Sequence, residues 1–159
     1  MNRAVFLNTN ESDYYLDDKF VFTAKRRTGL KYYILPTLCN VNNSEKNILT
    51  FSYANYFFFF RIKIIHQDLE TKISINKQNF FRYALDYGDE RIVIKHNLNP
   101  FSKKVCKIYS NENFVGTITR QLKSSKTNYL FEFLPSFKSH RAAMLCFIIN
   151  NLGIEDIAV

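Results

Sequence analysis

Residues 140–152 read HRAAMLCFIINNL, and this stretch decides the fold. It lacks the strict apolar–polar alternation of a strand and is rich in good helix formers, so it predicts a helix. Ser139 is placed to be its N-cap and Gly153 its C-cap. Every residue from Ala142 to Ile149 is apolar, and a helix that is apolar on all sides belongs inside a core. We therefore expect the rest of the chain to enclose this helix.

The sequence before the helix consists of short strand-like runs separated by turn clusters. The chain has 16 Phe and 10 Tyr but only 4 Gly and 3 Pro, and aromatic side chains favour strands. Turn residues at 86–89 and 110–113 predict two hairpins, and 40–46 predicts a loop. The expected strands are Lys31–Leu38, Ile48–Tyr53, Phe57–Ile65, Thr71–Ile75, Phe80–Leu85, Arg91–His96, Lys104–Tyr109, Phe114–Gln121 and Tyr129–Leu134. The expected fold class is mostly β (α+β), an antiparallel β-barrel or strongly curved sheet around a hydrophobic C-terminal helix.

The length of 159 residues suits one domain. We predict a polar, acidic and loosely ordered leader at residues 1–20 and a single β-barrel domain at 21–159. The three cysteines, Cys39, Cys106 and Cys146, form no disulfide or metal-ligand spacing, which favours a reducing compartment. The N-terminus lacks the apolar region of a signal peptide, and the apolar runs are shorter than the ~20 residues that span a bilayer. These features predict a cytoplasmic protein.

The formal net charge is +8 and is unevenly placed. Residues 1–18 hold one base and four acids, so the remaining residues carry a net charge of +11. A basic body behind an acidic leader predicts an anionic partner, such as nucleic acid, a phosphoinositide-bearing membrane or an acidic protein. The alternative is a compositional drift of Asn-, Lys- and Ile-rich sequences that involves no ligand.

Patterns that would indicate catalysis are weak. The four glycines stand alone, so no phosphate-binding loop is expected. The three histidines have no local pairing, and neither a zinc site nor a Cys–His pair such as Cys106 with His96 is favoured. Residues 68–72 contain an E-x-K fragment of the kind found in metal-dependent nucleases, but residues 46–67 supply no acid for it. We predict no catalytic residues, no metal and no cofactor.

Several basic groups are candidates for holding an anion. Arg61 and Lys63 are the most informative, because alternation along 57–65 places them on one face with Phe57 and Phe59, opposite Ile62 and Ile64. A face of cations and aromatics can press into a membrane interface or stack on unpaired bases. It can also simply pack against a neighbouring element. The candidate ligand-binding residues are Arg61, Lys63, Lys103, Lys104, Arg120, Lys123 and Lys126.

Three segments together resemble the tubby C-terminal-like superfamily, which includes tubby, phospholipid scramblase-like and LURP-one-related proteins. They are KIYSNENFVGTITR at 107–120, NYLFEF at 128–133 and the apolar residues 142–149. Residues 82–96 resemble an earlier hairpin of the same kind, and Tyr32–Leu38 resembles the family's first strand. The resemblance implies a barrel threaded by a hydrophobic helix and an association with membrane lipids, chiefly phosphoinositides. It assigns no ligand residue and implies no scramblase activity.

The leading hypothesis is a non-enzymatic, tubby-like module that binds an inner-leaflet phospholipid headgroup through surface Lys and Arg, as a peripheral membrane protein. The first alternative is a protein-interaction (immunity, adaptor or accessory) protein that uses its basic face against an acidic partner. The second alternative, ranked below it, is single-stranded nucleic-acid binding, because RNP1, zinc-finger and helix-turn-helix patterns are missing.

Overall fold

The computed structural model describes residues 1–8, 10–27, 37–44, 46–56, 59–79, 82–97, 104–123 and 126–151; at positions 8, 55, 56, 59, 60, 122, 123, 126 and 151 it describes the backbone alone. Within these ranges the chain forms one twelve-stranded antiparallel sheet and one helix, α1 (His140–Asn151). The strands are β1 (Asn2–Asn8), β2 (Glu11–Leu16), β3 (Lys19–Arg27), β4 (Thr37–Asn42), β5 (Asn47–Tyr56), β6 (Phe59–Gln67), β7 (Ile73–Asn79), β8 (Arg82–Tyr87), β9 (Glu90–His96), β10 (Lys104–Ser110), β11 (Asn113–Lys123) and β12 (Lys126–Phe133). The fold is mostly β, as the sequence predicts.

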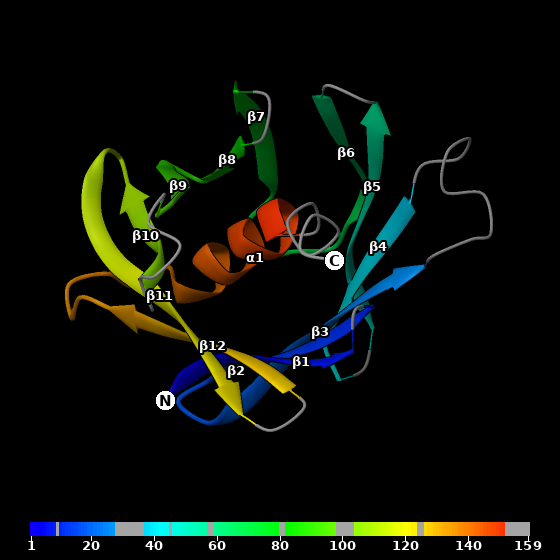
Figure 1. Cartoon of the computed structure of the whole chain (residues 1–159). Coiled ribbons are helices and arrows are strands. Elements are labelled where there is room, and N and C mark those ends of the chain that lie inside the picture. The colour runs from blue at the N-terminus through cyan, green and yellow to red at the C-terminus, as the bar shows by residue number, and fades with distance from the viewer. Residues whose placement is uncertain are drawn as a thin grey trace.

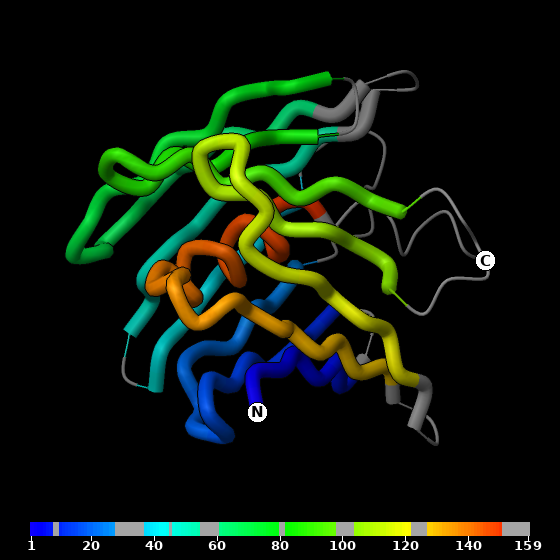
Figure 2. Tube along the Cα trace, turned by 90° about the vertical axis from the view of Figure 1, so that its left-hand side faces the viewer, coloured from blue at the N-terminus to red at the C-terminus, as the bar shows by residue number. Residues whose placement is uncertain are grey.

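The sheet curls around α1 until its two end strands meet. Its strand order is β6-β5-β4-β3-β2-β1-β12-β11-β10-β9-β8-β7, so β1 pairs with β12 while β6 and β7 occupy the two ends. Figure 1 shows the strands as a ring around α1, with β6 beside β7 at the top. Figure 2 shows the helix between the strands from a second direction. The result is a nearly closed barrel with a helix inside it.

The helix supplies the centre of the core. Each residue from Ala142 to Ile149 is at most 3% exposed. The ring of Phe147 packs against Tyr129 and Phe131 of β12, with centroid separations of 5.1 and 5.2 Å. Full burial of one such side chain stabilises a fold by roughly 1.5–3 kcal/mol. The expectation of a fully apolar helix enclosed by strands is therefore confirmed.

A buried amide ties the end of α1 to β8. The Oδ1 of Asn150 accepts the backbone N–H of Tyr83 at 2.9 Å, and its Nδ2 donates to the Tyr83 carbonyl at 3.0 Å. The same Nδ2 donates to the carbonyl of Cys146 at 2.8 Å. The pairing of β8 with β9 begins only at Leu85. At Tyr83 the side chain of Asn150 therefore makes the backbone hydrogen bonds that a paired strand would otherwise make.

Side chains join β6 to β7. The Nε2 of Gln67 donates to the Ile73 carbonyl at 3.1 Å, and its Oε1 accepts the Ile73 N–H at 2.8 Å. Farther along β6, the N–H of Ile62 donates to the hydroxyl of Tyr83, which belongs to β8 rather than β7, at 3.2 Å. No backbone ladder connects the two strands in the described part of the chain. The seam between β6 and β7 is thus the weakest join in the barrel wall.

The N-terminal part of the chain departs from the sequence-based expectation. Strands β1 and β2, which lie within the predicted leader, are part of the barrel wall, because β1 pairs with β2 and β12, and Ala4 and Tyr14 are at most 1% exposed. Their acidic neighbours face outward, which lowers the hydropathy of the segment without preventing burial of its other face. The predicted loop at 40–46 is strand as far as Asn42, because Val41 faces the core and is fully buried.

The predicted hairpins are confirmed. The turn between β8 and β9 lies at residues 88–89, and the turn between β10 and β11 lies at 111–112. Asn111 and Glu112 have φ of 47° and 69°, the left-handed pair that suits a two-residue hairpin. Ser139 occupies the N-cap position, since its carbonyl accepts the N–H of Ala143 at 3.1 Å. Gly153 and most of the predicted strand at 31–38 lie outside the described residues.

Candidate functional site

The barrel has two distinct ends, because each strand runs antiparallel to the one before it. Helix α1 begins at the first end, where His140 stacks on Phe133 at the close of β12 with a ring separation of 4.4 Å. It finishes at the second end, where Asn150 meets Tyr83 near the start of β8. We name them the His140 end and the Asn151 end. The turns at 17–18, 43–46, 68–72, 88–89 and 111–112 lie at the His140 end.

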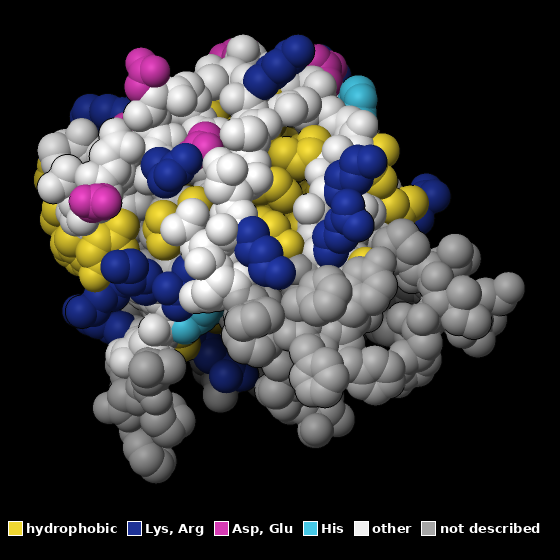
Figure 3. All heavy atoms as spheres, turned by 90° about the horizontal axis from the view of Figure 1, so that it is seen from above, with side chains coloured by type: hydrophobic (Ala, Val, Ile, Leu, Met, Phe, Trp, Pro, Cys, Tyr) yellow, Lys and Arg dark blue, Asp and Glu magenta, His cyan; other side chains and the backbone are white. Residues whose placement is uncertain are grey.

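Charge is divided unequally between these ends. Measured from the strand midpoints, the Asn151 half holds eleven bases and two acids among the described residues, a net charge of +9. The His140 half holds seven bases and nine acids, a net charge of −2, and Lys63 and Lys107 lie at the midpoints of their strands. The eleven bases are Lys25, Arg26, Arg27, Arg61, Lys77, Arg82, Lys95, Lys104, Arg120, Lys123 and Lys126, and the two acids are Glu11 and Asp13. Figure 3 shows Asp and Glu in the upper and left parts of one face and most Lys and Arg below them.

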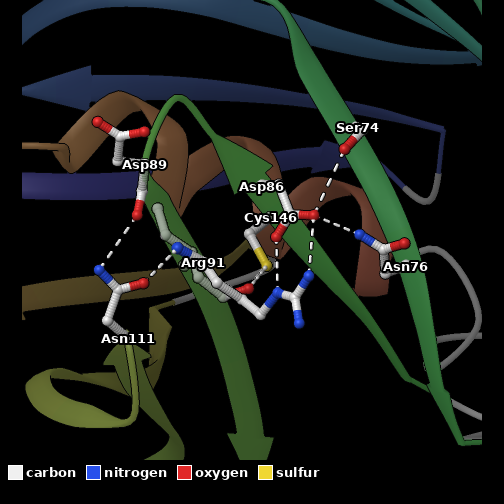
Figure 4. A network of polar contacts seen from close by, with 8 residues as sticks. Ser74, Asn76, Asp86, Asp89, Arg91, Asn111 and Cys146 are labelled. Carbon is white, nitrogen blue, oxygen red and sulfur yellow. Dashed lines mark hydrogen bonds and ion pairs between the residues drawn. The ribbon is translucent and has the colours of Figure 1, made fainter.

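Acids at the His140 end have local partners. Asp68 pairs with Lys46 at 2.8 Å, and Asp18 pairs with the chain's amino terminus at 3.0 Å. Asp86 accepts hydrogen bonds from Ser74, Asn76 and both Nε and Nη2 of Arg91, as Figure 4 shows. The hydrogen bond from Arg91 is the main cause that lowers the pKa of Asp86, so this carboxylate stays ionised. Within the described ranges, the net positive charge is therefore concentrated at the Asn151 end.

Four ionisable side chains extend the inner face of the sheet at this end. Alternate residues of a strand share a face, and so do cross-strand partners. Each of the four is the register partner of a buried, core-facing residue: Arg26 of Cys39, Lys77 of Tyr83, His96 of Cys106 and Arg120 of Tyr129. We call Arg26, Lys77, His96 and Arg120 the mouth. The inner face of four strands therefore changes from apolar to cationic where the barrel ends.

The end of α1 does not balance this charge. The free carbonyls at a helix C-terminus are equivalent to about half a negative charge, whereas three mouth residues carry a full positive charge each. No carboxylate lies on the inner face at this end among the described residues, because Glu11 and Asp13 alternate with the buried Ser12 and Tyr14 and so face outward. The mouth is therefore a site of positive potential next to the helix end.

At the mouth, the side chains of His96 and Cys106 are in contact. The Sγ of Cys106 is 3.2 Å from Nδ1 of His96 across β9 and β10. Burial raises the pKa of Cys106 to about 12, although the Arg82 guanidinium opposes the shift. Burial and then Arg82 lower the pKa of His96. Thiol and imidazole are both uncharged at neutral pH, so the pair does not form the thiolate that a nucleophilic cysteine needs.

The predicted ligand residues separate into two groups. Arg120 lies at the mouth, and Lys104 lies at the same end but opposite Thr119, on the outer face. Arg61 and Lys63 are exposed on the outer face of β6, while Ile62 and Ile64 pack against the core, as predicted.

The remaining predicted residues are only partly described. Lys123 and Lys126 are register partners at the Asn151 end, but nothing is described of their side chains. Lys103 and Phe57 lie outside the described residues, as does the side chain of Phe59.

Sequence reasoning did not single out Lys77 or Arg82, and it treated Arg26 only as part of the basic run at residues 25–27. It named His96 only as a possible partner of Cys106, in a catalytic pair that it did not favour, and the structure does bring these two side chains into contact. For Arg26, Lys77 and His96 the signal is positional, since each follows alternate core-facing residues of its strand, such as Phe22 and Ala24 before Arg26. Reading that signal requires the strand boundaries, and β3 and the second half of β7 were not predicted.

Three further observations concern metal binding, the E-x-K fragment and the length of the helix. No group of three or more potential metal-ligating side chains occurs in the described ranges. The E-x-K fragment at 68–72 forms the turn between β6 and β7, where Asp68 is engaged by Lys46. Within the same ranges, α1 is too short to cross a membrane, and no other helix is present.

No protein-family model, curated protein or solved structure matches the chain. The resemblance to tubby-like proteins therefore stays a prediction, and it rests on the quoted segments and on a barrel that encloses a C-terminal helix.

Proposed function

We propose that the protein is a non-enzymatic, tubby-like binding module whose Asn151 end holds an anionic phospholipid headgroup, such as that of a phosphoinositide, at the inner face of a membrane. The supporting observation is the division of charge among the described residues, +9 in one half of the barrel against −2 in the other. A Lys or Arg near an anionic membrane surface contributes about 1 kcal/mol of attraction. Several bases at one end of a barrel therefore favour one orientation on such a surface.

The arrangement of the bases favours a compact ligand over an extended one. Arg26, Lys77 and Arg120 come from strands spaced around the barrel rather than from one continuous groove. A headgroup with several phosphates can meet such a ring, whereas a nucleic-acid strand needs a track along its backbone. An acidic protein surface and a single-stranded nucleic acid are accordingly the alternative outcomes of the test.

Vesicle co-sedimentation tests the proposal. Vesicles of phosphatidylcholine alone are compared with vesicles that also contain phosphatidylserine or a phosphoinositide. We expect pelleting to increase with phosphoinositide content and to fall between about 0.1 M and about 1 M salt, as the Debye length shrinks from ~10 to ~3 Å. Negligible pelleting with all three would sink the lipid claim. Recovery of one stoichiometric protein, or salt-sensitive retention on a single-stranded oligonucleotide, would then support the corresponding alternative.

A charge-reversal variant separates the mouth from the outer face. Arg61→Glu with Lys63→Glu changes the exposed face of β6 and leaves the mouth intact. Unchanged vesicle binding by this variant would show that the outer face of β6 does not contribute to membrane binding.

A further inference from the structure

The barrel wall is interrupted at the seam between β6 and β7, and backbone groups of β6 face this seam (Figure 1). The N–H of Ile62 points away from β5 into the seam, because it donates to the hydroxyl of Tyr83 on β8, the strand beyond β7. Alternate residues of a strand direct their backbone groups to the same side, so the N–H and C=O of Ile64 also face the seam. No ladder from β7 reaches these groups in the described part of the chain.

Backbone groups of β7 face the same seam from the other side. The N–H and C=O of Ile73 bond to the side-chain amide of Gln67 on β6, so alternation directs the N–H and C=O of Ile75 toward β6 as well. Strand edges of this kind are templates for pairing with another extended chain. Gln67 and Tyr83 therefore each bind a backbone position that an added strand would otherwise pair with.

The side chains along the seam define which kind of strand would fit. On the inner side, Ile62, Ile64 and Ile75 pack against the core but are only partly buried, so further apolar side chains can cover them. On the outer side, Arg61 and Lys63 are exposed, and within the described ranges no ion pair engages either one. An added strand would meet apolar groups on one face and cations on the other.

The two cations decide between a second copy of this chain and a different partner. If two copies paired through β6, Arg61 and Lys63 of one copy would lie beside those of the other, and like charges across a strand pair are destabilising. Bases on an edge strand commonly prevent such self-association. Acidic side chains at the same places would form stabilising cross-strand pairs instead.

We propose that the seam between β6 and β7 binds an extended peptide segment of a partner protein, in which acidic and apolar residues alternate. The peptide backbone pairs with the strand edges at Ile62, Ile64 and Ile75. Its apolar side chains extend the core, and its acidic side chains lie beside Arg61 and Lys63. This site uses other residues than the mouth and does not depend on the proposed lipid binding.

Fluorescence anisotropy with labelled synthetic peptides and the full chain tests the site. The probe is the capped peptide Thr-Val-Glu-Val-Glu-Val-Thr. One control peptide has lysine in place of glutamate, and the other is N-methylated at both glutamates and so lacks two backbone donors. We expect saturable binding of the probe and binding about tenfold weaker or worse for each control peptide. Equal binding of all three peptides would contradict the proposal.

Charge reversals locate the peptide on β6. Arg61→Glu with Lys63→Glu should weaken binding of the probe by roughly tenfold or more and strengthen binding of the lysine peptide. The matched control is Lys95→Glu with Lys107→Glu, which reverses two exposed register partners on β9 and β10 and should leave binding unchanged. Equal weakening by the two variants would show a general effect of charge and refute the site.

Two deletions of side-chain hydrogen bonds test the backbone pairing. Tyr83→Phe and Gln67→Ala each free a backbone position that faces the seam, so each should tighten binding of the probe by roughly two- to tenfold. Hydrogen exchange followed by NMR should show that the probe protects the amides of Ile64 and Ile75. Protection confined to amides away from the seam would place the peptide elsewhere and overturn the proposal.

The peptide site and the proposed function fail in different ways. Arg61→Glu with Lys63→Glu should lose the probe and keep vesicle binding, since the mouth is unchanged. Vesicle binding without binding of the probe would remove the peptide site and leave the proposed function in place, and the reverse result would do the opposite. If the probe does not bind and sedimentation equilibrium shows dimers, the seam pairs with a second copy and the peptide proposal is wrong.

Discussion

Gly116 of β11 lies opposite Phe133 of β12, where there is no room for a side chain. A Cβ at this position would stand 2.4 Å from the backbone carbonyl of Glu132, closer than real Cβ contacts allow. The glycine at this position therefore has a physical reason in this chain, which is strand packing rather than turn formation. Residue-scale features of this kind leave a trace in the sequence as a glycine in an otherwise β-favouring run.

The amide of Asn150 leaves no comparable trace. Its importance depends on Tyr83, a residue 67 positions away. Arg26, Lys77 and His96 are similar, because each is meaningful only once its cross-strand partner is known. Clustering of charge sufficed to find Arg120 and Lys104. The sequence could identify which residues carry charge at this end but not which of them face the barrel interior.

Replacement of Asn150 by Leu should destabilise the fold by about 2–5 kcal/mol. The change leaves the buried N–H and C=O of Tyr83 without partners, and each orphaned group costs about 1–3 kcal/mol. Urea unfolding measures the difference. Gln78→Ala, at an exposed position of β7, is the control and should change stability by less than about 0.5 kcal/mol. A loss for Asn150→Leu no larger than that of the control would refute the strand-substitute role.

At the scale of elements, α1 was the most predictable part of the chain. Its residues 142–149 are uniformly apolar, and all of them are buried in the barrel. Strands β1 and β2 were the least predictable, since their outer faces carry Arg3, Glu11 and Asp13 and resemble a polar leader. Period-two alternation across short strands is a weaker signal than a continuous apolar helix. The barrel was therefore inferred from the apolar helix that it must enclose rather than from the pattern of its own strands.

The seam between β6 and β7 should open locally when the two side-chain hydrogen bonds of Gln67 are removed. Gln67→Ala deletes both hydrogen bonds to Ile73 and leaves every backbone ladder in place. Hydrogen exchange followed by mass spectrometry should show faster exchange in β6 and β7, with protection of β10 to β12 unchanged. The same experiment on Gln78→Ala should match the unaltered protein. Uniformly faster exchange in all strands would show that Gln67 stabilises the whole barrel rather than the seam alone.

At the scale of the whole molecule, the buried thiols predict a loss of stability at high pH. Burial raises the pKa values of Cys39, Cys106 and Cys146 to about 12 each. The unfolded chain releases these protons near the ordinary thiol pKa, about 9, while the folded chain retains them. Stability is therefore complete below about pH 9 and falls as the pH rises toward 12.

From pH 8 to pH 10 the three thiols together should remove about 4 kcal/mol from the free energy of unfolding. Urea unfolding at the two pH values measures the fall. In Cys106→Ala one thiol is absent, so the fall should be about 1.4 kcal/mol smaller. An identical fall in Cys106→Ala and the unaltered protein would assign it to other groups.

The separation of charge along the barrel is the property on which the proposed function depends. It arises because bases occupy the strand ends near Asn151 and acids occupy the turns near His140. The net positive charge was evident from the sequence. Which end of the barrel carries it was not, because that depends on the end at which each strand begins and finishes.

The most direct test compares two charge reversals of equal size in vesicle binding. Lys77→Glu with Arg120→Glu changes the mouth, and Lys138→Glu with Arg141→Glu changes exposed bases at the His140 end. On phosphoinositide vesicles the mouth variant should bind about 30-fold more weakly or worse, since two bases contribute about 1 kcal/mol each. The His140-end variant should bind within about threefold of the unaltered protein. Equal weakening of the two variants would contradict the assignment of binding to the Asn151 end.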